Sequence, residues 1–143
     1  MFTRRMLTAG DLMTSDPDVV APDTSIKEAI VLMNRGKERH LPVVQDGKLI
    51  GMVTDRDIRL AVNSPLIDVK PVERLHFMED IPVERCMTAN PQTVTVDTPI
   101  YQVAGLLARY KFGAVPVLDG DDLVGIISVI DLLEFLALEP ETA

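Results

Sequence analysis

The sequence predicts an α/β fold made of two copies of one β-α-β-β-α unit, packed together as a pseudo-two-fold module. Three observations support this prediction. The 143-residue chain aligns with itself without gaps at an offset of 74 residues. Apolar residues recur at helical spacing in both copies, and a turn signal lies between two apolar runs in each copy. Length alone suggests one domain, and the repeat divides that domain into two halves.

The self-alignment begins where Met13-Thr14 meets Met87-Thr88, and it extends at least to Asp57, which meets Asp131. We therefore expect a first repeat over residues 8–62, a linker over 63–81 and a second repeat over 82–138. A unit of ~50–60 residues buries too little surface to be comfortably stable alone. Each repeat is expected to pack on the other.

Each repeat is expected to start with a short strand and a helix. The strands cover 19–21 and 94–96, and each is followed by apolar residues spaced i, i+3, i+4 and i+7. These residues are Ile26, Ala29, Ile30 and Met33 in the first repeat, and Ile100, Val103, Ala104 and Leu107 in the second. Thr98 before Pro99 predicts a helix N-cap. By register the first repeat caps on Thr24, with Ser25-x-x-Glu28 as a rival capping box.

A hairpin and a second helix follow in each repeat. Strands over 41–44 and 49–53 flank Asp46-Gly47, and strands over 115–118 and 123–127 flank Asp119-Gly120. Pro42 and Pro116 cannot donate to a strand ladder, which suggests edge positions or strand starts. The last helices begin near Thr54 and Ser128. The tail helix over 131–139 has a broader apolar face than a lone surface helix needs, which favours contact with another subunit.

Composition and charge exclude several classes of protein. Fourteen Lys and Arg against twenty-two Asp and Glu give a net charge of −8, which argues against a nucleic-acid partner. No apolar run approaches the ~20 residues of a membrane span, and no clean signal-peptide core follows Arg4-Arg5. A single cysteine fits a reducing cytoplasm. We therefore expect a cytoplasmic protein that binds neither nucleic acid nor membrane.

The sequence offers little for catalysis. Cys86 aligns with the apolar Leu12, so a packing role is favoured over a nucleophile. His40 and His76 are the only imidazoles, without Cys or His at metal-ligand spacing, and His76 is expected on the surface of the linker. No Gly-rich phosphate loop is present. We expect no metal site and no enzyme activity; a catalytic Cys86 remains an alternative that thiol reactivity would test.

Both repeats end their hairpin on one polar pattern, Thr54-x-x-Asp57 and Ser128-x-x-Asp131. A structural interpretation is that both are capping boxes. A functional interpretation uses the same geometry, because the N–H groups of a helix start and a hydroxyl suit a phosphate. The carboxylate would repel a phosphate but would accept hydrogen bonds from a ribose diol. A nucleoside phosphate fits these groups better than a bare anion.

A pair of cationic side chains near this pattern occurs in the first repeat only. Arg39-His40 precedes a strand, and Lys37 and Arg56 are close in sequence. Arg can hold phosphate bidentately, and His40 could add charge near neutral pH. A solvated loop is the alternative for Arg39 and His40. The second repeat has Gly113-Ala114 at those positions, so two sites would differ in their affinity for phosphate.

Taken together, the motifs resemble a tandem pair of CBS domains, a Bateman module. The resemblance covers about 8–62 and 82–138, and it is strongest to stand-alone bacterial members, including acetoin-utilisation B-type proteins. It implies a regulatory module, for example in energy sensing, that binds an adenosine compound (AMP, ADP, ATP or an S-adenosyl compound). It also implies no catalytic cofactor, a homodimer, and a partner protein regulated in trans by a ligand-induced population shift.

The resemblance also implies roles for individual residues. The ribose-binding carboxylates would be Asp57 and Asp131, and the nearby hydroxyls Thr54 and Ser128. The phosphate contacts would be Arg39 and His40, with Arg56 close by and Gly113 and Ala114 at the matching positions of the second repeat. The base pocket would be lined near Thr14 and Thr88. A ligand-free scaffold, in which the polar pattern only caps helices, is the alternative.

Overall fold

The structure is a computed structural model, and it describes residues 6–62 and 78–138. The chain forms two compact units. The first-repeat unit is Asp18–Pro91, and the second-repeat unit combines Met1–Pro17 with Gln92–Ala143. The N-terminal segment thus packs with the second repeat, and the segment before Gln92 packs with the first. His76 and most of the expected linker lie outside the described residues. Residues 78–80, near the end of that linker, are described and form a helical turn.

The first-repeat unit contains the predicted helix, hairpin and helix. These are α2 (Ile26–Gly36), β2 (His40–Gln45), β3 (Lys48–Thr54) and α3 (Asp55–Val62). The unit is completed by a 3-10 turn, η1 (Val83–Arg85), and by β4 (Thr88–Ala89), which pairs with β3 in a sheet of order β2-β3-β4. The strand expected over 19–21 is reduced to one parallel bridge between Val20 and Val43.

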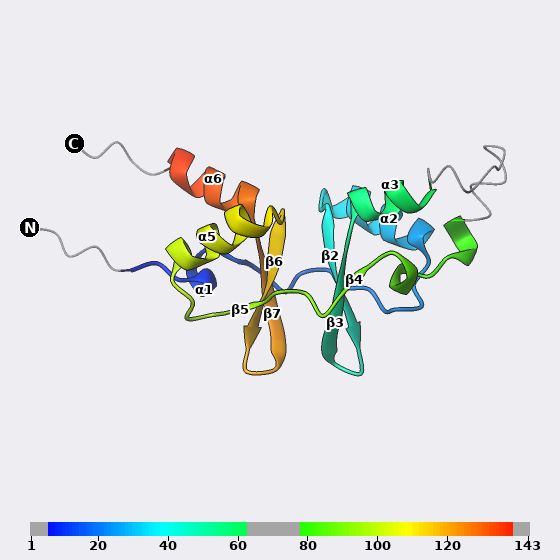
Figure 1. The fold of residues 1–143 in the computed structure, drawn as a ribbon, viewed down its shortest axis with the longest axis horizontal. Coiled ribbons are helices and arrows are strands. Elements are labelled where there is room, and N and C mark those ends of the chain that lie inside the picture. Colours follow the sequence, from blue (N-terminus) through cyan, green and yellow to red (C-terminus); the bar gives the residue numbers. More distant parts are fainter. Residues whose placement is uncertain (1–5, 63–77, 139–143) are drawn as a thin grey trace, which may run out of the picture. The chain divides into compact units, whose positions relative to one another are not determined.

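The second-repeat unit has the same construction. Its elements are α1 (Ala9–Leu12), β1 (Thr14–Ser15), β5 (Val94–Thr95), α5 (Ile100–Tyr110), β6 (Ala114–Asp119), β7 (Asp122–Ser128) and α6 (Val129–Leu138). The sheet order is β1-β7-β6-β5. In each unit the two long helices pack beside the hairpin (Figure 1). The α/β fold and its repeated helix–hairpin–helix elements are therefore confirmed.

Each unit has its own hydrophobic core between helices and sheet. In the first-repeat unit the fully buried side chains include Ile26, Leu41, Val43, Val53 and Val83. In the second-repeat unit they include Ala9, Val103, Val115, Val117 and Ile127. Among the helices of the described residues, none combines the length and apolar character needed to cross a membrane.

The helix starts differ from the prediction by one residue. Ser25, the rival cap, begins α2, and its Oγ accepts a hydrogen bond of 3.1 Å from Glu28 N–H. Thr24 instead accepts a hydrogen bond from Ala21 N–H, and Thr98 likewise from Thr95 N–H. Both threonine hydroxyls stabilise the turn before the helix, so the predicted caps on Thr24 and Thr98 are wrong.

The two prolines have similar surroundings. Pro42 lies in β2, an end strand of its three-stranded sheet as predicted, but on the outer side of β2 Val20 N–H donates to the Pro42 carbonyl at 3.0 Å and Val20 bridges to Val43. Pro116 lies in β6, which has neighbours on both sides, so the edge prediction is wrong for this residue. The strand tolerates Pro116 because the parallel pairing with β5 begins only at Val117, and no ladder donor is needed one residue earlier.

Candidate functional site

The hydroxyl and carboxylate of the repeated polar pattern are hydrogen-bonded to the helix start in both units. Thr54 N–H donates to Asp57 Oδ2 at 2.9 Å, and Asp57 N–H donates to Thr54 Oγ1 at 3.1 Å. The matching distances for Ser128 and Asp131 are 2.8 and 3.0 Å. The capping-box interpretation is therefore confirmed. These bonds engage Oδ2 of each carboxylate, and its other oxygen, Oδ1, is not part of the box.

The hairpin register places the Arg39-His40 pair beside the capping box. His40 pairs with Thr54 across β2 and β3, and Asp55 N–H donates to the Arg39 carbonyl at 3.0 Å. Four of the predicted site residues therefore come together at one end of the hairpin, namely Arg39, His40, Thr54 and Asp57. The second-repeat unit has the same backbone arrangement, in which Ala114 pairs with Ser128 and Val129 N–H donates to Gly113.

The predicted base-pocket threonines join the opposite repeat. Thr88 in β4 pairs with Met52, two residues before Thr54. Thr14 in β1 pairs with Ile126, two residues before Ser128. Each set of predicted residues is thus assembled from two distant chain segments. Thr88 belongs with the Asp57 set and Thr14 with the Asp131 set, which the sequence repeat did not show.

Two glycines allow these threonine segments to cross the hairpins. A Cβ at Gly51 would lie 3.0 Å from the Thr88 carbonyl oxygen, and a Cβ at Gly125 would lie 2.9 Å from that of Thr14. The same Cβ atoms would collide with the side chains of Met87 and Met13. The glycine that precedes each Thr/Ser-x-x-Asp pattern is therefore a close-approach position, and it is the signal that could have indicated the crossing segment.

His40 differs from the expectation in its charge. The imidazole is partly buried, and this desolvation lowers its pKa below the ordinary value, although Asp55 and Asp57 act in the opposite direction. His40 is therefore mainly neutral at neutral pH and can offer hydrogen bonds rather than charge. The lowered pKa argues against the positive charge that His40 could add near neutral pH, and its cause, burial, is not visible in the sequence.

The lowered pKa of His40 predicts a dependence of stability on pH. An imidazole in the unfolded chain, with its ordinary pKa of about 6.5, takes up a proton before the folded one does, so stability falls as pH drops below that value. We expect His40→Gln to lose less stability than the unmodified chain between pH 7.5 and 5.5. Denaturant unfolding at both pH values checks this, and His76→Gln is the matched control. An equal loss in His40→Gln would contradict it.

Charged groups surround the start of α3. Arg39 Nη1 lies 3.9 Å from Asp55 Oδ2, and Arg59 Nη2 lies 3.5 Å from the same oxygen. The Arg39 side chain is 77% exposed, so this ion pair contributes little to stability and leaves the guanidinium accessible. Arg39, Asp55 and Arg59 also line a cleft of about 560 Å³ between α2 and α3. Asp55 is a charged neighbour of the predicted site that the sequence analysis had not singled out.

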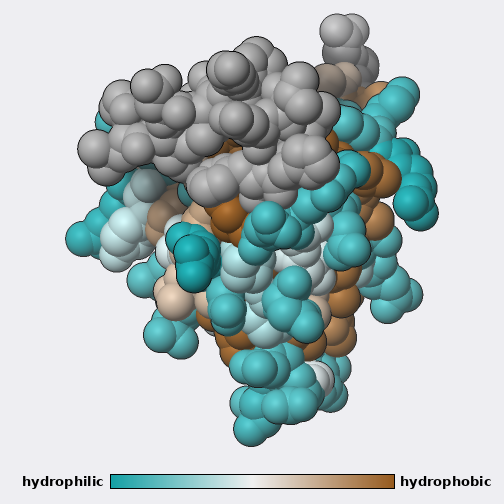
Figure 2. All heavy atoms as spheres, turned by 90° about the vertical axis from the view of Figure 1, so that its right-hand side faces the viewer, coloured by the Kyte–Doolittle hydropathy of each residue, from teal (hydrophilic) through white to brown (hydrophobic). Residues whose placement is uncertain are grey.

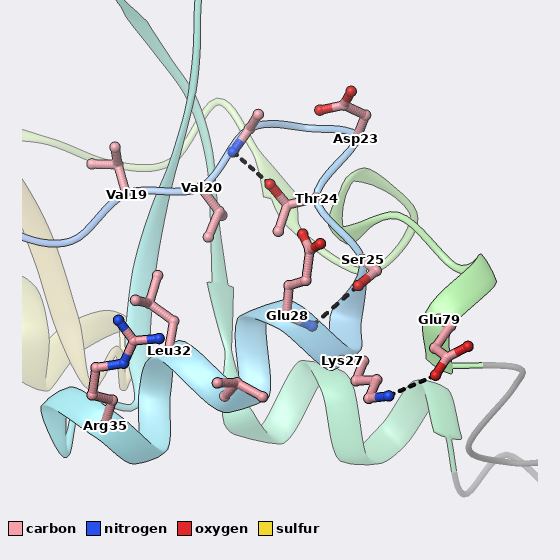
Figure 3. A pocket seen from close by; sticks show the side chains of 12 residues that line it. Val19, Val20, Asp23, Thr24, Ser25, Lys27, Glu28, Leu32, Arg35 and Glu79 are labelled. Carbon is pink, nitrogen blue, oxygen red and sulfur yellow. Dashed lines mark hydrogen bonds and ion pairs between the residues drawn. The ribbon is translucent and has the colours of Figure 1, made fainter.

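A second cleft of the first-repeat unit lies away from these residues. It has a volume of about 760 Å³ and lies between the segment 19–25 and α2. Arg35 and Leu32 extend toward Val19, and Lys27 Nζ contacts Glu79 Oε1 at 2.6 Å across its other end (Figure 3). None of the predicted site residues lines it.

The thiol of Cys86 gives no support to catalysis. Cys86 packs against the core of the first-repeat unit, and its thiol donates to the Val83 carbonyl at 3.5 Å. Burial, aided by the charge of Asp57, raises the pKa of Cys86 to about 11, which suppresses the nucleophilic thiolate. Within residues 6–62 and 78–138, no group of three His, Cys, Asp or Glu side chains could hold a metal ion.

Comparison with known proteins assigns this arrangement to a family. The sequence matches the CBS domain twice, over residues 9–64 and 79–138. The chain belongs to the CBS-domain family. The two matches make it a tandem CBS pair. The chain is 35% identical over 133 residues to a CBS domain-containing protein of Dictyostelium discoideum, and the aligned region covers 90% of this chain and 92% of that protein.

Solved structures of CBS pairs share the fold. CBSX2 in complex with AMP is 29% identical, with a TM-score of 0.77 over 94% of this chain and 99% of that one. The CBS pair of MJ0100, in complex with 5′-methylthioadenosine and S-adenosyl-L-methionine, is 27% identical, with a TM-score of 0.74 over 95% and 100%. A putative acetoin utilization protein from Vibrio cholerae is 26% identical, with a TM-score of 0.76 over 93% and 92%. The predicted similarity to stand-alone CBS pairs is confirmed.

Proposed function

We propose that this CBS pair is a regulatory module without catalytic activity of its own, which binds an adenosine compound at the ends of its two hairpins. The observation that carries the proposal is the assembly at each hairpin end of a hydroxyl, a carboxylate and a crossing threonine, as in Thr54, Asp57 and Thr88. The carboxylate supplies an acceptor for ribose hydroxyls, and the helix start supplies N–H groups for a phosphate.

The proposal extends to what ligand binding does. A ligand that binds one conformation more tightly shifts the population toward that conformation, and a partner protein that recognises it is thereby regulated in trans. AMP-bound and S-adenosylmethionine-bound relatives support an adenosine ligand. The lone cysteine supports a cytoplasmic location.

Calorimetric titration of the full chain with AMP tests the proposal. We expect Asp57→Ala to weaken AMP binding roughly ten- to a hundredfold, because a hydrogen bond to a charged group contributes about 1.5–3 kcal/mol. Asp57→Ala also removes a helix cap, so a matched control is needed. Ser25→Ala removes the cap of α2 in the same unit, at about 1 kcal/mol, and is expected to leave AMP binding unchanged.

A ligand-free scaffold is the second candidate, because both capping boxes are complete with protein groups alone. On that hypothesis Asp57→Ala lowers stability by about 1 kcal/mol and no adenosine compound binds. On the proposed function, a ligand at 100 times its Kd raises stability by about 2.7 kcal/mol. A flat thermal-shift panel with AMP, ADP, ATP and S-adenosylmethionine would decide for the scaffold.

We also propose a homodimer formed through the helices of the second-repeat unit. In the coloured part of Figure 2, hydrophilic side chains of the first-repeat unit surround smaller hydrophobic areas. On α6, Leu133 and Leu136 are exposed three residues apart on one side of the helix, and exposed apolar side chains of this kind mark interaction surfaces. A second copy offers the same surface, so a self-complementary two-fold contact buries both.

The dimer is expected to dissociate when a charge enters that surface. Leu133→Glu on α6 should convert the dimer into a monomer, as measured by light scattering during size-exclusion chromatography. Leu60→Glu is the matched control, because Leu60 on α3 is 63% exposed against 54% for Leu133 but belongs to the other unit. A monomeric unmodified chain, or dissociation by Leu60→Glu alone, would contradict the proposed surface.

A further inference from the structure

The two hairpin ends share one backbone geometry and differ in their side chains. Arg39 O accepts from Asp55 N–H at 3.0 Å, and Gly113 O accepts from Val129 N–H at 2.9 Å. The side chains around these bonds are charged or polar in the first-repeat unit and small or apolar in the second. The pairs are Arg39 and Gly113, His40 and Ala114, Asp55 and Val129, Arg56 and Ile130, and Arg59 and Leu133.

The exchange removes the arginines from the second end. In the first-repeat unit, Arg39, Arg56 and Arg59 balance three carboxylates, Asp55, Asp57 and Glu38, the last of which lines the same cleft as Arg39 and is matched by Phe112. In the second-repeat unit, the matching positions leave Asp131 as the one charged member, for a net charge of −1. Lys37, which lines the same cleft as Arg39, and Arg35 recur as Lys111 and Arg109, so they do not distinguish the ends.

A ligand with a phosphate experiences the two ends differently. Near Asp57, the exposed Arg39 guanidinium can pair with phosphate oxygens bidentately. Near Asp131, the carboxylate repels the phosphate, and no cation of this set offsets the repulsion. Val129 and Ile130 present exposed apolar surface there. That surface suits an uncharged, apolar 5′ substituent such as a thioether.

We propose that the two sites divide adenosine compounds by the charge of the 5′ substituent. The Asp57 site takes adenosine compounds with a 5′-phosphate, and the Asp131 site takes adenosine compounds that carry no phosphate. The inference rests on the proposed function, because it assigns ligand classes to the sites proposed there. The module then responds separately to phosphorylated and unphosphorylated adenosine compounds.

Titrations with AMP and 5′-methylthioadenosine test the inference on full-length chains with one site disabled. In Asp131→Ala, which keeps the Asp57 site, we expect AMP to bind at least tenfold more tightly than 5′-methylthioadenosine. In Asp57→Ala the order should reverse. Hydrogen exchange on the unmodified chain provides a measurement that needs no variant. AMP should protect residues 40–57 preferentially, and 5′-methylthioadenosine residues 114–131.

A grafted cation gives the sharpest comparison. Gly113→Arg in the Asp57→Ala chain places an arginine where the first repeat already has one, and it should raise AMP affinity several-fold, more in 50 mM than in 300 mM salt. Gly113→Gln is the uncharged control and should not. Equal preference for both ligands at the two sites would overturn this inference and leave the proposed function intact. Failure of both ligands to bind the unmodified chain would overturn the proposed function itself.

Discussion

Replacement of Ala9 by aspartate is expected to destabilise the unit that contains the second repeat, although Ala9 lies at the start of the first repeat of the sequence. Ala9 is fully buried in the core of that unit, and its N–H donates to Thr98 O at 2.8 Å. An uncompensated buried charge typically costs about 3–5 kcal/mol, so we expect a loss of this size. The equivalent change in the other unit is Val83→Asp, because Val83 is fully buried and its N–H donates to Thr24 O at 2.7 Å.

Hydrogen exchange resolves which unit opens. Ala9→Asp should remove protection from β6 and β7, and Val83→Asp should remove it from β2 and β3. Met6→Asp is a matched control, since it adds the same charge to the same segment at a side chain that is 60% exposed; its stability should change by less than about 0.5 kcal/mol. Loss of protection in β2 and β3 on Ala9→Asp would contradict the packing of the N-terminal segment with the second repeat.

Gly125→Ala is expected to lower the free energy of unfolding by about 1–3 kcal/mol, the usual cost of overpacking. The added methyl group would lie 2.9 Å from a backbone oxygen of Thr14 and against the Met13 side chain. The backbone cannot give way without disrupting the pairing of β1 with β7. Gly51→Ala should behave alike, because its Cβ would lie 3.0 Å from the Thr88 carbonyl oxygen.

The control substitution for this prediction is expected to change the free energy of unfolding in the opposite direction. Gly105 lies in α5 with no atom within 4 Å of an added Cβ. Gly105→Ala is therefore expected to raise stability by about 0.5–1 kcal/mol through its better helix propensity. Chemical denaturation of the three variants measures both effects. Unchanged stability in Gly125→Ala would mean that β1 does not cross β7 as closely as described.

The long elements were predictable because their patterns are local. The helical spacing that begins at Ile26 and Ile100 identified α2 and α5, and the Asp46-Gly47 turn identified the first hairpin. Asp46 and Gly47 both have positive φ, at 52° and 77°, as the favoured two-residue hairpin turn requires. The capping boxes at Thr54 and Ser128 were equally visible, because all their groups lie within four residues.

The crossing segments were not predictable in the same way. β1 and β4 have two residues each, which is too short for any periodicity, and their partners lie more than 35 residues away in sequence. Burial was also hidden, so the lowered pKa of His40 could not be predicted. The expected helix caps on Thr24 and Thr98 failed for a further reason, since a hydroxyl next to a helix start can serve the preceding turn equally well.

The arrangement of Ala9 and Val83 bears on how such a chain arose. The boundaries of the duplicated sequence and of the folding units do not coincide, because the leading segment of each copy packs in the unit that contains the other copy. An unduplicated ancestor would have had to give that segment to a second molecule, as domain-swapped dimers do. Duplication places donor and acceptor in one chain, so that their association becomes intramolecular. Assembly of either unit therefore no longer depends on how much protein the cell contains.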